Sequence, residues 1–229
     1  MGNLVEYQDW NDEEFKEDKK RAEKEKQGKY LRYGEDGKLR VRFLPPRVGE
    51  PRFLEVYEHF YKSDDDKWVK YVCPEKSGDR DCTDCARARK LFATGSEVDK
   101  KRAKDFVAKK KIYVNVIDRD DEIFGPKILE LKASQKARLF KIRDIKGNFT
   151  DPGPRGYDIT LTKSGKGFST EYDAFDNDRS ELGDEGWIAR QADLREMTTV
   201  PTDEELEKMG VPLFEPDTDD EAEAEELYQ

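Results

Sequence analysis

Four residues of this chain have the types and spacing of a metal site. Thirteen residues separate His59, the only histidine, from Cys73; eight separate Cys73 from Cys82, and two separate Cys82 from Cys85. Three thiols and one imidazole, with two of the thiols in a Cys-x2-Cys turn, form a typical ligand set for a structural zinc ion. Such a set completes a tetrahedron and leaves no open coordination position, so we expect one Zn²⁺ with a structural role.

Two other interpretations of these residues remain open. The histidine and the cysteines could be ordinary buried core residues, or Cys82 and Cys85 could form a redox pair. The redox interpretation leaves Cys73 and His59 unexplained, so zinc is preferred. A structural zinc ion would contribute on the order of 10 kcal/mol to the folding of its domain.

The same assignment excludes much enzymatic chemistry. With its only histidine bound to metal, the chain cannot build a Ser-His-Asp triad or an HExxH protease site. Neither a GxxxxGK[ST] loop nor a GxGxxG stretch occurs, so nucleotide hydrolysis and dinucleotide binding lack their usual signatures. We therefore expect a protein that is not an enzyme; a nuclease with a carboxylate-bound Mg²⁺ is the enzymatic alternative.

Short strands and a few helices must position these ligands. Alternation of apolar and polar residues predicts strands at 39–44, 53–61, 67–73, 112–117 and 127–131, and a hairpin of 157–162 with 168–172. Helices are expected at 86–93, at 96–107 and from 134 to 146, where Gly147 is the expected stop. In the first strand, Leu39, Val41 and Phe43 share one face, and Arg40 and Arg42 are expected to face outward. The count predicts a mainly β (α+β) fold with an OB-fold-like barrel core, an inserted Cys3His zinc subdomain and a few short helices.

Charge divides the chain into three regions. The net charge is −10, yet residues 29–146 carry 30 basic and 21 acidic groups, whereas residues 201–229 carry 1 and 12. We predict a charged N-terminal arm at 1–28, one core domain at 29–200 with the zinc subdomain at about 59–108, and an acidic C-terminal tail at 201–229. A basic middle region favours a polyanionic partner, and the acidic tail could compete with that partner or simply improve solubility.

The ends and the apolar content indicate a compartment. No stretch approaches the ~18 consecutive apolar residues of a membrane span, and residues 1–12 lack the basic and apolar regions of a secretory signal. We therefore expect a cytoplasmic protein with reduced thiols and no membrane partner.

Basic and aromatic residues alternate through the middle of the chain, as single-strand binding requires. Lysine and arginine contact phosphates, and exposed aromatic rings stack on unpaired bases. For a single aromatic residue the core remains the more common place, so the prediction depends on the whole set. The predicted nucleic-acid-binding residues are Arg40, Arg42, Tyr57, Trp68, Lys70, Lys110, Lys111, Tyr113, Arg138, Lys166, Phe168 and Tyr172.

Residues 38–200 resemble a known family. The similar pieces are KLRVRFLPP, His59, KWVKYVC, CTDC at 82–85, KKKIYVNVIDRD, residues 127–142, Gly167-Phe168-Ser169 with Tyr172, and residues 193–198. Together they look like the zinc-containing single-stranded DNA-binding proteins of T-even-type bacteriophages, which are helix-destabilising replication proteins.

This resemblance implies an OB-fold core, a zinc subdomain beside a basic cleft, self-association along the strand through the N-terminal region, and an acidic C-terminal region that contacts replication or recombination proteins. Carried over by position, His59, Cys73, Cys82 and Cys85 are the zinc ligands. Trp68, Tyr113, Phe168 and Tyr172 match cleft aromatics, and Arg42 lies in the matching strand.

We therefore expect a sequence-independent coat for single-stranded DNA in phage replication, recombination and repair, located in the cytoplasm of the infected host cell. A zinc-stabilised protein-interaction module or an RNA-binding regulator of phage replication or transcription is the alternative. An RNA-binding protein would prefer RNA over DNA, and an interaction module would show no salt-sensitive affinity for DNA.

Overall fold

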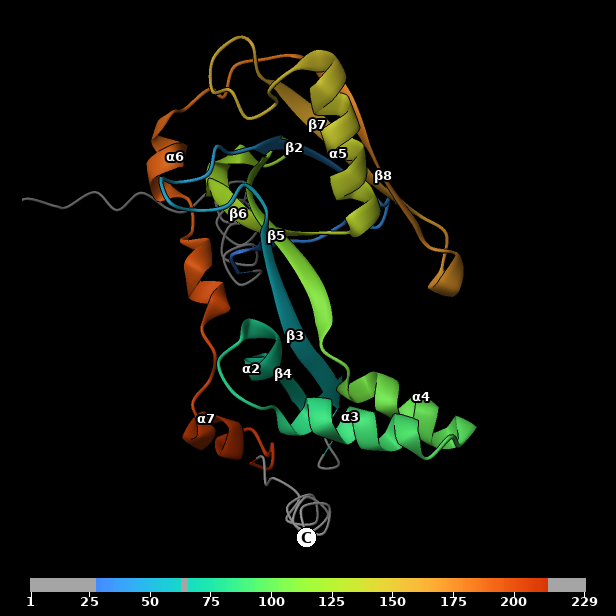
Figure 1. Cartoon of the computed structure of the whole chain (residues 1–229). Helices are drawn as coiled ribbons and strands as arrows, with labels where there is room; N and C mark the ends of the chain where they lie inside the picture. Colours follow the sequence, from blue (N-terminus) through green and yellow to red (C-terminus); the bar gives the residue numbers. More distant parts are fainter. Residues whose placement is uncertain (1–27, 63–65, 214–229) are drawn as a thin grey trace, which may run out of the picture. The chain divides into compact units, whose positions relative to one another are not determined.

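A computed structural model describes residues 28–62 and 66–213, with only the backbone of Phe168 (Figure 1). The predicted N-terminal arm, apart from Gly28, and residues 214–229 lie outside the described residues. The described chain forms two compact units. Unit 1 comprises residues 28–47 and 114–192, and unit 2 comprises residues 48–62, 66–113 and 193–213. The sequence predicts a single core domain, whereas the second unit contains the predicted zinc subdomain and extends beyond it at both ends.

Unit 1 is built on a six-stranded sheet with the order β1-β6-β5-β2-β7-β8. The β1–β6 pair is parallel, and β2 pairs antiparallel with both β5 and β7. Helix α5 runs beside β8, and the Ser134 hydroxyl donates to the Tyr172 carbonyl at 3.0 Å (Figure 1). The elements are β1 (Tyr30–Leu31), β2 (Lys38–Phe43), the second half of β5 (Lys109–Asp118), η1 (Glu122–Phe124), β6 (Pro126–Leu131), α5 (Ala133–Lys146), β7 (Tyr157–Ser164), η2 (Gly167–Ser169), β8 (Glu171–Arg179) and α6 (Gly186–Arg190).

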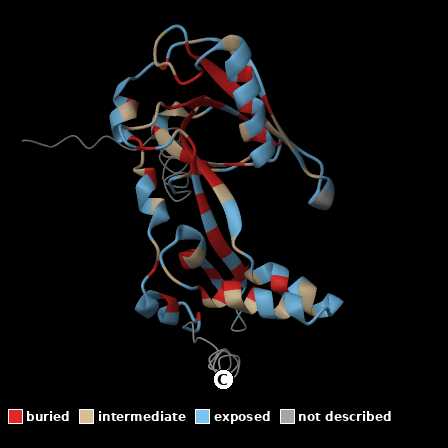
Figure 2. Ribbon diagram, in the orientation of Figure 1, coloured by how far each residue is buried: buried red, intermediate tan, exposed pale blue. Residues whose placement is uncertain are grey.

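The core of unit 1 follows the predicted alternation of β2. Leu39, Val41 and Phe43 are buried, as are Ile159 of β7, which lies opposite Val41, and Leu139 of α5. Figure 2 shows β2 and β7 largely in the colour of buried residues. The apolar face of the first strand is therefore confirmed.

The outward orientation predicted for Arg42 is wrong. Its side chain is 0% exposed, and its guanidinium donates to the Asp151 carbonyl at 2.6 Å and to the Ser180 hydroxyl at 3.2 Å. It also lies 3.6 Å from the carboxylate of Asp158. The loop backbone at Gly156 fits against this group so closely that a Cβ there would lie 2.1 Å from Arg42 Nη2. Arg42 is thus a structural cation beneath a loop and is not available to a phosphate.

Unit 2 is a three-stranded antiparallel sheet with helices. Strand β3 pairs with β4 on one side and with the first half of β5 on the other, and α3 and α4 pack together (Figure 1). The hydroxyl of Ser96 accepts the Asp99 amide and caps α4. The elements are β3 (Leu54–Lys62), β4 (Trp68–Val72), α2 (Pro74–Ser77), α3 (Thr83–Ala93), α4 (Glu97–Phe106), η3 (Leu194–Thr198) and α7 (Asp203–Lys208).

The two faces of the β3–β4 hairpin differ in character. Directly opposed residues of antiparallel strands share a face, so the pairs His59–Tyr71 and Tyr61–Val69 lie on one face. All four residues are buried. The buried cluster on this face comprises Tyr61, Val69, Tyr71, Cys73, Cys82, Cys85, Leu206 and Val211.

The C-terminal boundary differs from the prediction. The acidic tail is expected to begin at residue 201, yet Leu206 and Val211 are buried against the cysteine cluster. The Thr202 hydroxyl accepts the Glu205 amide, and the Glu205 carboxylate accepts the Thr202 amide, which together cap α7. Residues 201–213 therefore belong to unit 2.

The architecture is mixed α+β with a core made mostly of β-sheet. Among the described residues, no helix is both long and apolar enough to cross a bilayer.

Candidate metal centre and basic aromatic surface

The four predicted metal ligands converge from three elements of unit 2. His59 lies in β3, Cys73 directly follows β4 and caps α2, Cys82 caps α3, and Cys85 lies in the first turn of α3. The Cys-x2-Cys pair therefore spans the start of α3, which brings both thiols to the same side of that helix.

The distances within this cluster fit a tetrahedral metal site. His59 Nε2 lies 3.3 Å from Cys82 Sγ and 3.7 Å from Cys85 Sγ, and Cys73 Sγ lies 3.5 Å from Cys85 Sγ. A tetrahedral zinc ion with its usual bond lengths would place sulfur atoms about 3.8 Å apart and sulfur about 3.6 Å from nitrogen. All four residues are buried, and their ligand atoms lie within 4.8 Å of one another. The group could hold a metal ion, as the spacing predicts.

Neighbouring groups fix the orientation of two ligands. The Nδ1–H of His59 donates to the Phe106 carbonyl at 2.8 Å, which leaves Nε2 as the atom that faces the three sulfurs. The Lys76 amide donates to Cys73 Sγ at 3.4 Å. Both contacts are of the kind that orient ligands around protein-bound metals.

The electrostatics of the cluster favour a cation among the sulfurs. Burial alone lowers the pKa of His59, but hydrogen bonds and charge from Cys73 and Cys82 outweigh burial and raise it to about 10. Hydrogen bonds from Cys73 and Cys85 hold the pKa of the Cys82 thiol far below its usual range. The same hydrogen-bond network raises the pKa of the Cys85 thiol, so the cluster without metal retains protons that a metal ion would displace from His59 and the thiols on binding.

Asp84, which lies between Cys82 and Cys85 in the sequence, is fully buried. The Tyr71 hydroxyl donates to Asp84 Oδ2 at 2.6 Å and lies 3.8 Å from Cys82 Sγ. Burial raises the pKa of the Tyr71 hydroxyl, and the nearby Asp84 raises it further. This bond ties the turn to β4.

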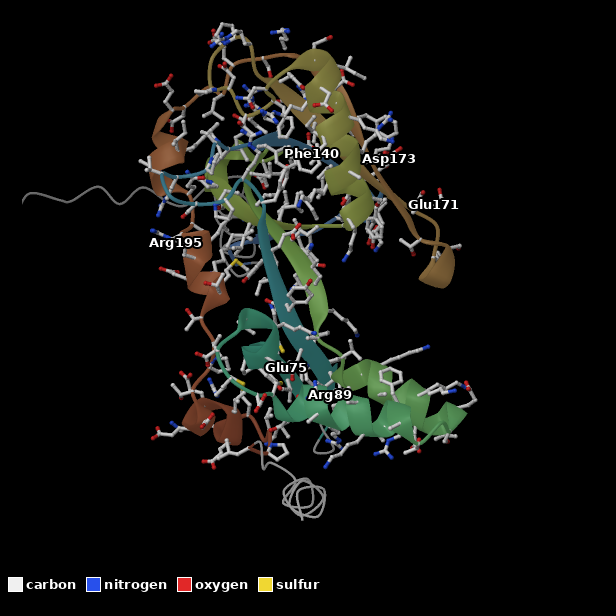
Figure 3. All side chains as sticks on the ribbon, viewed as in Figure 1. Glu75, Arg89, Phe140, Glu171, Asp173 and Arg195 are labelled. Atoms are coloured by element: carbon white, nitrogen blue, oxygen red, sulfur yellow. The ribbon has the colours of Figure 1, made fainter. Side chains whose placement is uncertain are left out.

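An ion pair on the surface joins α2 and α3, the two helices next to the cysteines. Arg89 Nη1 of α3 donates to both carboxylate oxygens of Glu75 in α2, at 2.7 and 3.0 Å (Figure 3). Because both side chains reach solvent, the pair adds less than about 1 kcal/mol of stability. It joins α2, which follows Cys73, to α3, which holds Cys85.

The face of the hairpin opposite the metal ligands carries exposed rings among lysines. Phe60 and Trp68 stack with centroids 4.8 Å apart and planes at 5°, and they are 43% and 66% exposed. The strand register puts lysines of all three strands on this face. We call this set the Trp68 surface: Phe60, Lys62, Trp68, Lys70, Lys109 and Lys111.

Of the residues predicted to bind nucleic acid in unit 2, Trp68, Lys70 and Lys111 belong to the Trp68 surface, and Phe60 was missed. Alternation along β3 could have identified Phe60, because it shares a face with Lys62.

Tyr113 is wrong as a stacking residue. Its ring is 2% exposed, and its hydroxyl donates to Glu58 at 3.0 Å. Tyr57 and Lys110 oppose each other on the other face, where Lys110 is ion-paired with Glu55.

The remaining predicted residues lie in unit 1. Arg40 is half-exposed and ion-paired with Asp158 at 2.9 Å. Arg138 of α5 lies 3.8 Å from Asp173 of β8, which is labelled in Figure 3. Lys166 is exposed in the turn before β8. The side chain of Phe168 lies outside the described residues.

Tyr172, a predicted nucleic-acid-binding residue, lies near a second aromatic ring and a lysine. Its ring meets that of Tyr33 edge to face at 6.1 Å, and Lys132 Nζ lies 5.7 Å from the Tyr172 centroid. No periodic pattern in the sequence connects Tyr33 or Lys132 with Tyr172, so the sequence alone does not predict this group.

A scan against protein-family models and a search of curated proteins give no match to this chain.

Proposed function

We propose that this chain is a single-stranded DNA-binding protein that coats the strand without sequence preference during phage replication, recombination and repair, and that it is not an enzyme. The observation that carries the proposal is the Trp68 surface. An exposed, stacked pair of rings flanked by lysines has the two components that single-strand binding requires.

Each component has a distinct task. A base that stacks on Trp68 gains about 1 to 3 kcal/mol, and the gain is similar for all four bases because each has a π-face. Lysines such as Lys70 and Lys111 neutralise phosphates and release counterions, so the affinity should fall as salt rises. Neither contact reads a base edge, which accounts for binding without sequence preference.

Unit 1 supports a second part of the proposal, an OB-fold-like barrel that also contacts the strand. Its five longer strands pair in the order β6-β5-β2-β7-β8, and α5 stands between β6 and β7. This order suits the partly open Greek-key barrel of the OB-fold, a fold that commonly binds oligonucleotides. Tyr172, with Lys132 near its ring, would provide a further stacking site.

We propose zinc as the metal of the His59 cluster. Three thiols with one imidazole suit Zn²⁺ better than hard cations such as Mg²⁺ or Ca²⁺, which prefer oxygen. His59, Cys73, Cys82 and Cys85 would hold the ion, which supplies structural cross-linking rather than chemistry. The cluster would thereby fix β3 and β4, the strands that carry the Trp68 surface. Residues 214–229, which carry eight acidic and no basic residues, would contact replication or recombination proteins.

Substitution of Trp68 tests the proposal. Trp68→Ala should weaken binding of an oligo(dT) strand by roughly 5- to 150-fold, the equivalent of about 1 to 3 kcal/mol. Phe92→Ala is the matched control, because Phe92 is a similarly exposed ring on α3; it should leave the affinity unchanged. Fluorescence anisotropy of a labelled strand measures both. Equal affinity of the Trp68 variant and the wild type would contradict the proposed role of this surface.

A further inference from the structure

Unit 2 contains a pocket that shares only Lys62 with the Trp68 surface and is lined by none of the four metal ligands. It has a volume of about 490 Å³, within the usual range for ligand sites. It lies between the β3–β4 hairpin, α3, the end of α4 and the segment that follows α7. Its lining residues are Tyr61, Lys62, Lys67, Arg87, Phe106, Glu207, Lys208, Met209, Gly210 and Pro212.

The charge of the lining favours an anion. Four side chains of the pocket are cationic, and one, Glu207, is anionic. Lys62 also pairs with Asp66, but both of these side chains are largely exposed, so water screens that pair. The pocket therefore has a net positive charge.

Arg87 is held in place by a ring. Its guanidinium carbon lies 4.1 Å from the centroid of Phe106, and Phe106 in turn meets Tyr61 edge to face at 5.1 Å. Cation–π stacking leaves the in-plane N–H donors of an arginine directed away from the ring. A planar guanidinium of this kind binds the paired oxygens of a phosphate in a bidentate manner.

The pocket adjoins the Trp68 surface. Lys62 lines the pocket and lies directly opposite Trp68 in the β3–β4 ladder, so the Cβ atoms of the two residues are about 5 Å apart. Lys67, which also lines the pocket, precedes Trp68 in the chain. Because Tyr61 and Trp68 lie on opposite faces of the hairpin, a strand whose base stacks on Trp68 would pass the end of the hairpin at Lys62 and Lys67 to bring a phosphate to the pocket.

We propose that this pocket binds a phosphate group of a nucleotide, with Arg87 and Lys208 as its principal ligands. The inference deepens the proposed function, since the DNA strand on the Trp68 surface would supply the phosphate. A free nucleoside monophosphate has the same chemistry and should bind more weakly, because it lacks the neighbouring contacts.

The test is an NMR titration of the full-length, metal-loaded chain with dTMP, with thymidine as the control that lacks the phosphate. The Nε–H signal of Arg87 and the amide signal of Gly210 should shift with dTMP and not with thymidine. Arg87→Ala and Lys208→Ala should each weaken dTMP binding by about tenfold, the usual effect of losing one charge-assisted hydrogen bond. Arg102→Ala, on the exposed surface of α4, should leave it unchanged.

Three results would overturn the pocket assignment. The first is the absence of a shift with dTMP, and the second is an equal response to thymidine. The third is a response to dTMP that appears only when the acidic residues between 215 and 226 of the full-length chain are changed to Asn and Gln. Such a result would identify these acidic residues, and not a nucleotide phosphate, as the occupant of the pocket. Since Arg87 lies two residues from Cys85, Lys208→Ala keeps the test valid if the Arg87 variant does not fold.

The pocket and the proposed function can fail separately. Binding of dTMP without binding of oligo(dT) would refute single-strand coating and leave the pocket assigned. Binding of oligo(dT) with no response to dTMP would refute the pocket alone.

Discussion

Metal removal should unfold unit 2 and leave unit 1 folded. The buried cluster around the metal ligands of unit 2 has eight residues, of which Cys73, Cys82 and Cys85 are three, so the apolar contacts that hold this cluster together without metal are few. A structural zinc ion contributes about 10 to 16 kcal/mol, whereas an ordinary domain has about 5 to 15 kcal/mol of total stability. Loss of the ion therefore removes an amount comparable to the whole stability of the unit.

Hydrogen exchange read by mass spectrometry measures this directly. With a strong chelator, peptides from β3 and β4 should lose protection, and peptides from β7 in unit 1 should keep it; added Zn²⁺ should restore the first set. Cys85→Ser should reproduce the effect of the chelator. Glu75→Gln is the matched control, because it breaks only the exposed pair with Arg89 and should keep both the metal and the protection.

Two outcomes would refute this reasoning. Full protection of β3 after complete removal of metal would show that the apolar core suffices without the ion. A metal content well below one zinc per chain in the purified protein would show that the four ligands do not act as a zinc site.

Other perturbations test individual contacts. Leu206→Ala should destabilise unit 2 by about 2 to 5 kcal/mol in urea unfolding, because Leu206 is 7% exposed in the core around the cysteines; an effect below 0.5 kcal/mol would remove residues 201–213 from that core. Arg42→Lys should cost unit 1 about 3 kcal/mol, since lysine cannot replace both hydrogen bonds, while affinity for single-stranded DNA stays unchanged; loss of affinity without loss of stability would restore Arg42 as a DNA contact. The hydrogen bond from Lys146 lowers the pKa of Asp176 below 3.8, so it stabilises the protein above that pH, and this contribution is lost as pH falls through the lowered value. Carboxyl NMR should show the pKa of Asp176 return toward 3.8 in Lys146→Ala, and an unmoved pKa would contradict the assignment.

The sequence predicts the elements well where one local signal dominates. Alternation locates β2 and β3 within one or two residues, and Gly147 ends α5 as expected. The metal cluster follows from residue type and spacing, because cysteines and a histidine have few other uses in that pattern. These features depend on residues that are close together in the chain, so they can be predicted from a single sequence.

Features that depend on distant residues were not predictable. Arg42 alternates with apolar residues like an exposed side chain, and only the loop at Asp151 and Gly156 buries it. The sequence around Tyr113 is that of a stacking residue, but in the structure its ring is buried and its hydroxyl donates to Glu58. The charge pattern around a residue does not reveal whether a segment later in the chain covers its side chain.

Acidity concealed the last helix of unit 2. Residues 201–229 read as a tail by their charge, although the capping box of Thr202 and Glu205 was a usable signal for α7. Two apolar residues, Leu206 and Val211, anchor this segment, because both are buried in the cluster around the cysteines. The net charge of a segment does not reveal that two of its apolar residues are buried.

The central claim, binding of single-stranded DNA through phosphates and stacking, is tested most directly by one salt titration. Affinities for matched single-stranded DNA, single-stranded RNA and duplex DNA would be measured across a series of NaCl concentrations. We expect the tightest binding to single-stranded DNA, with log affinity falling linearly with log salt at a slope of about −0.7 per phosphate contacted. Affinity that does not change with salt, or that is highest for RNA or duplex DNA, would contradict the account.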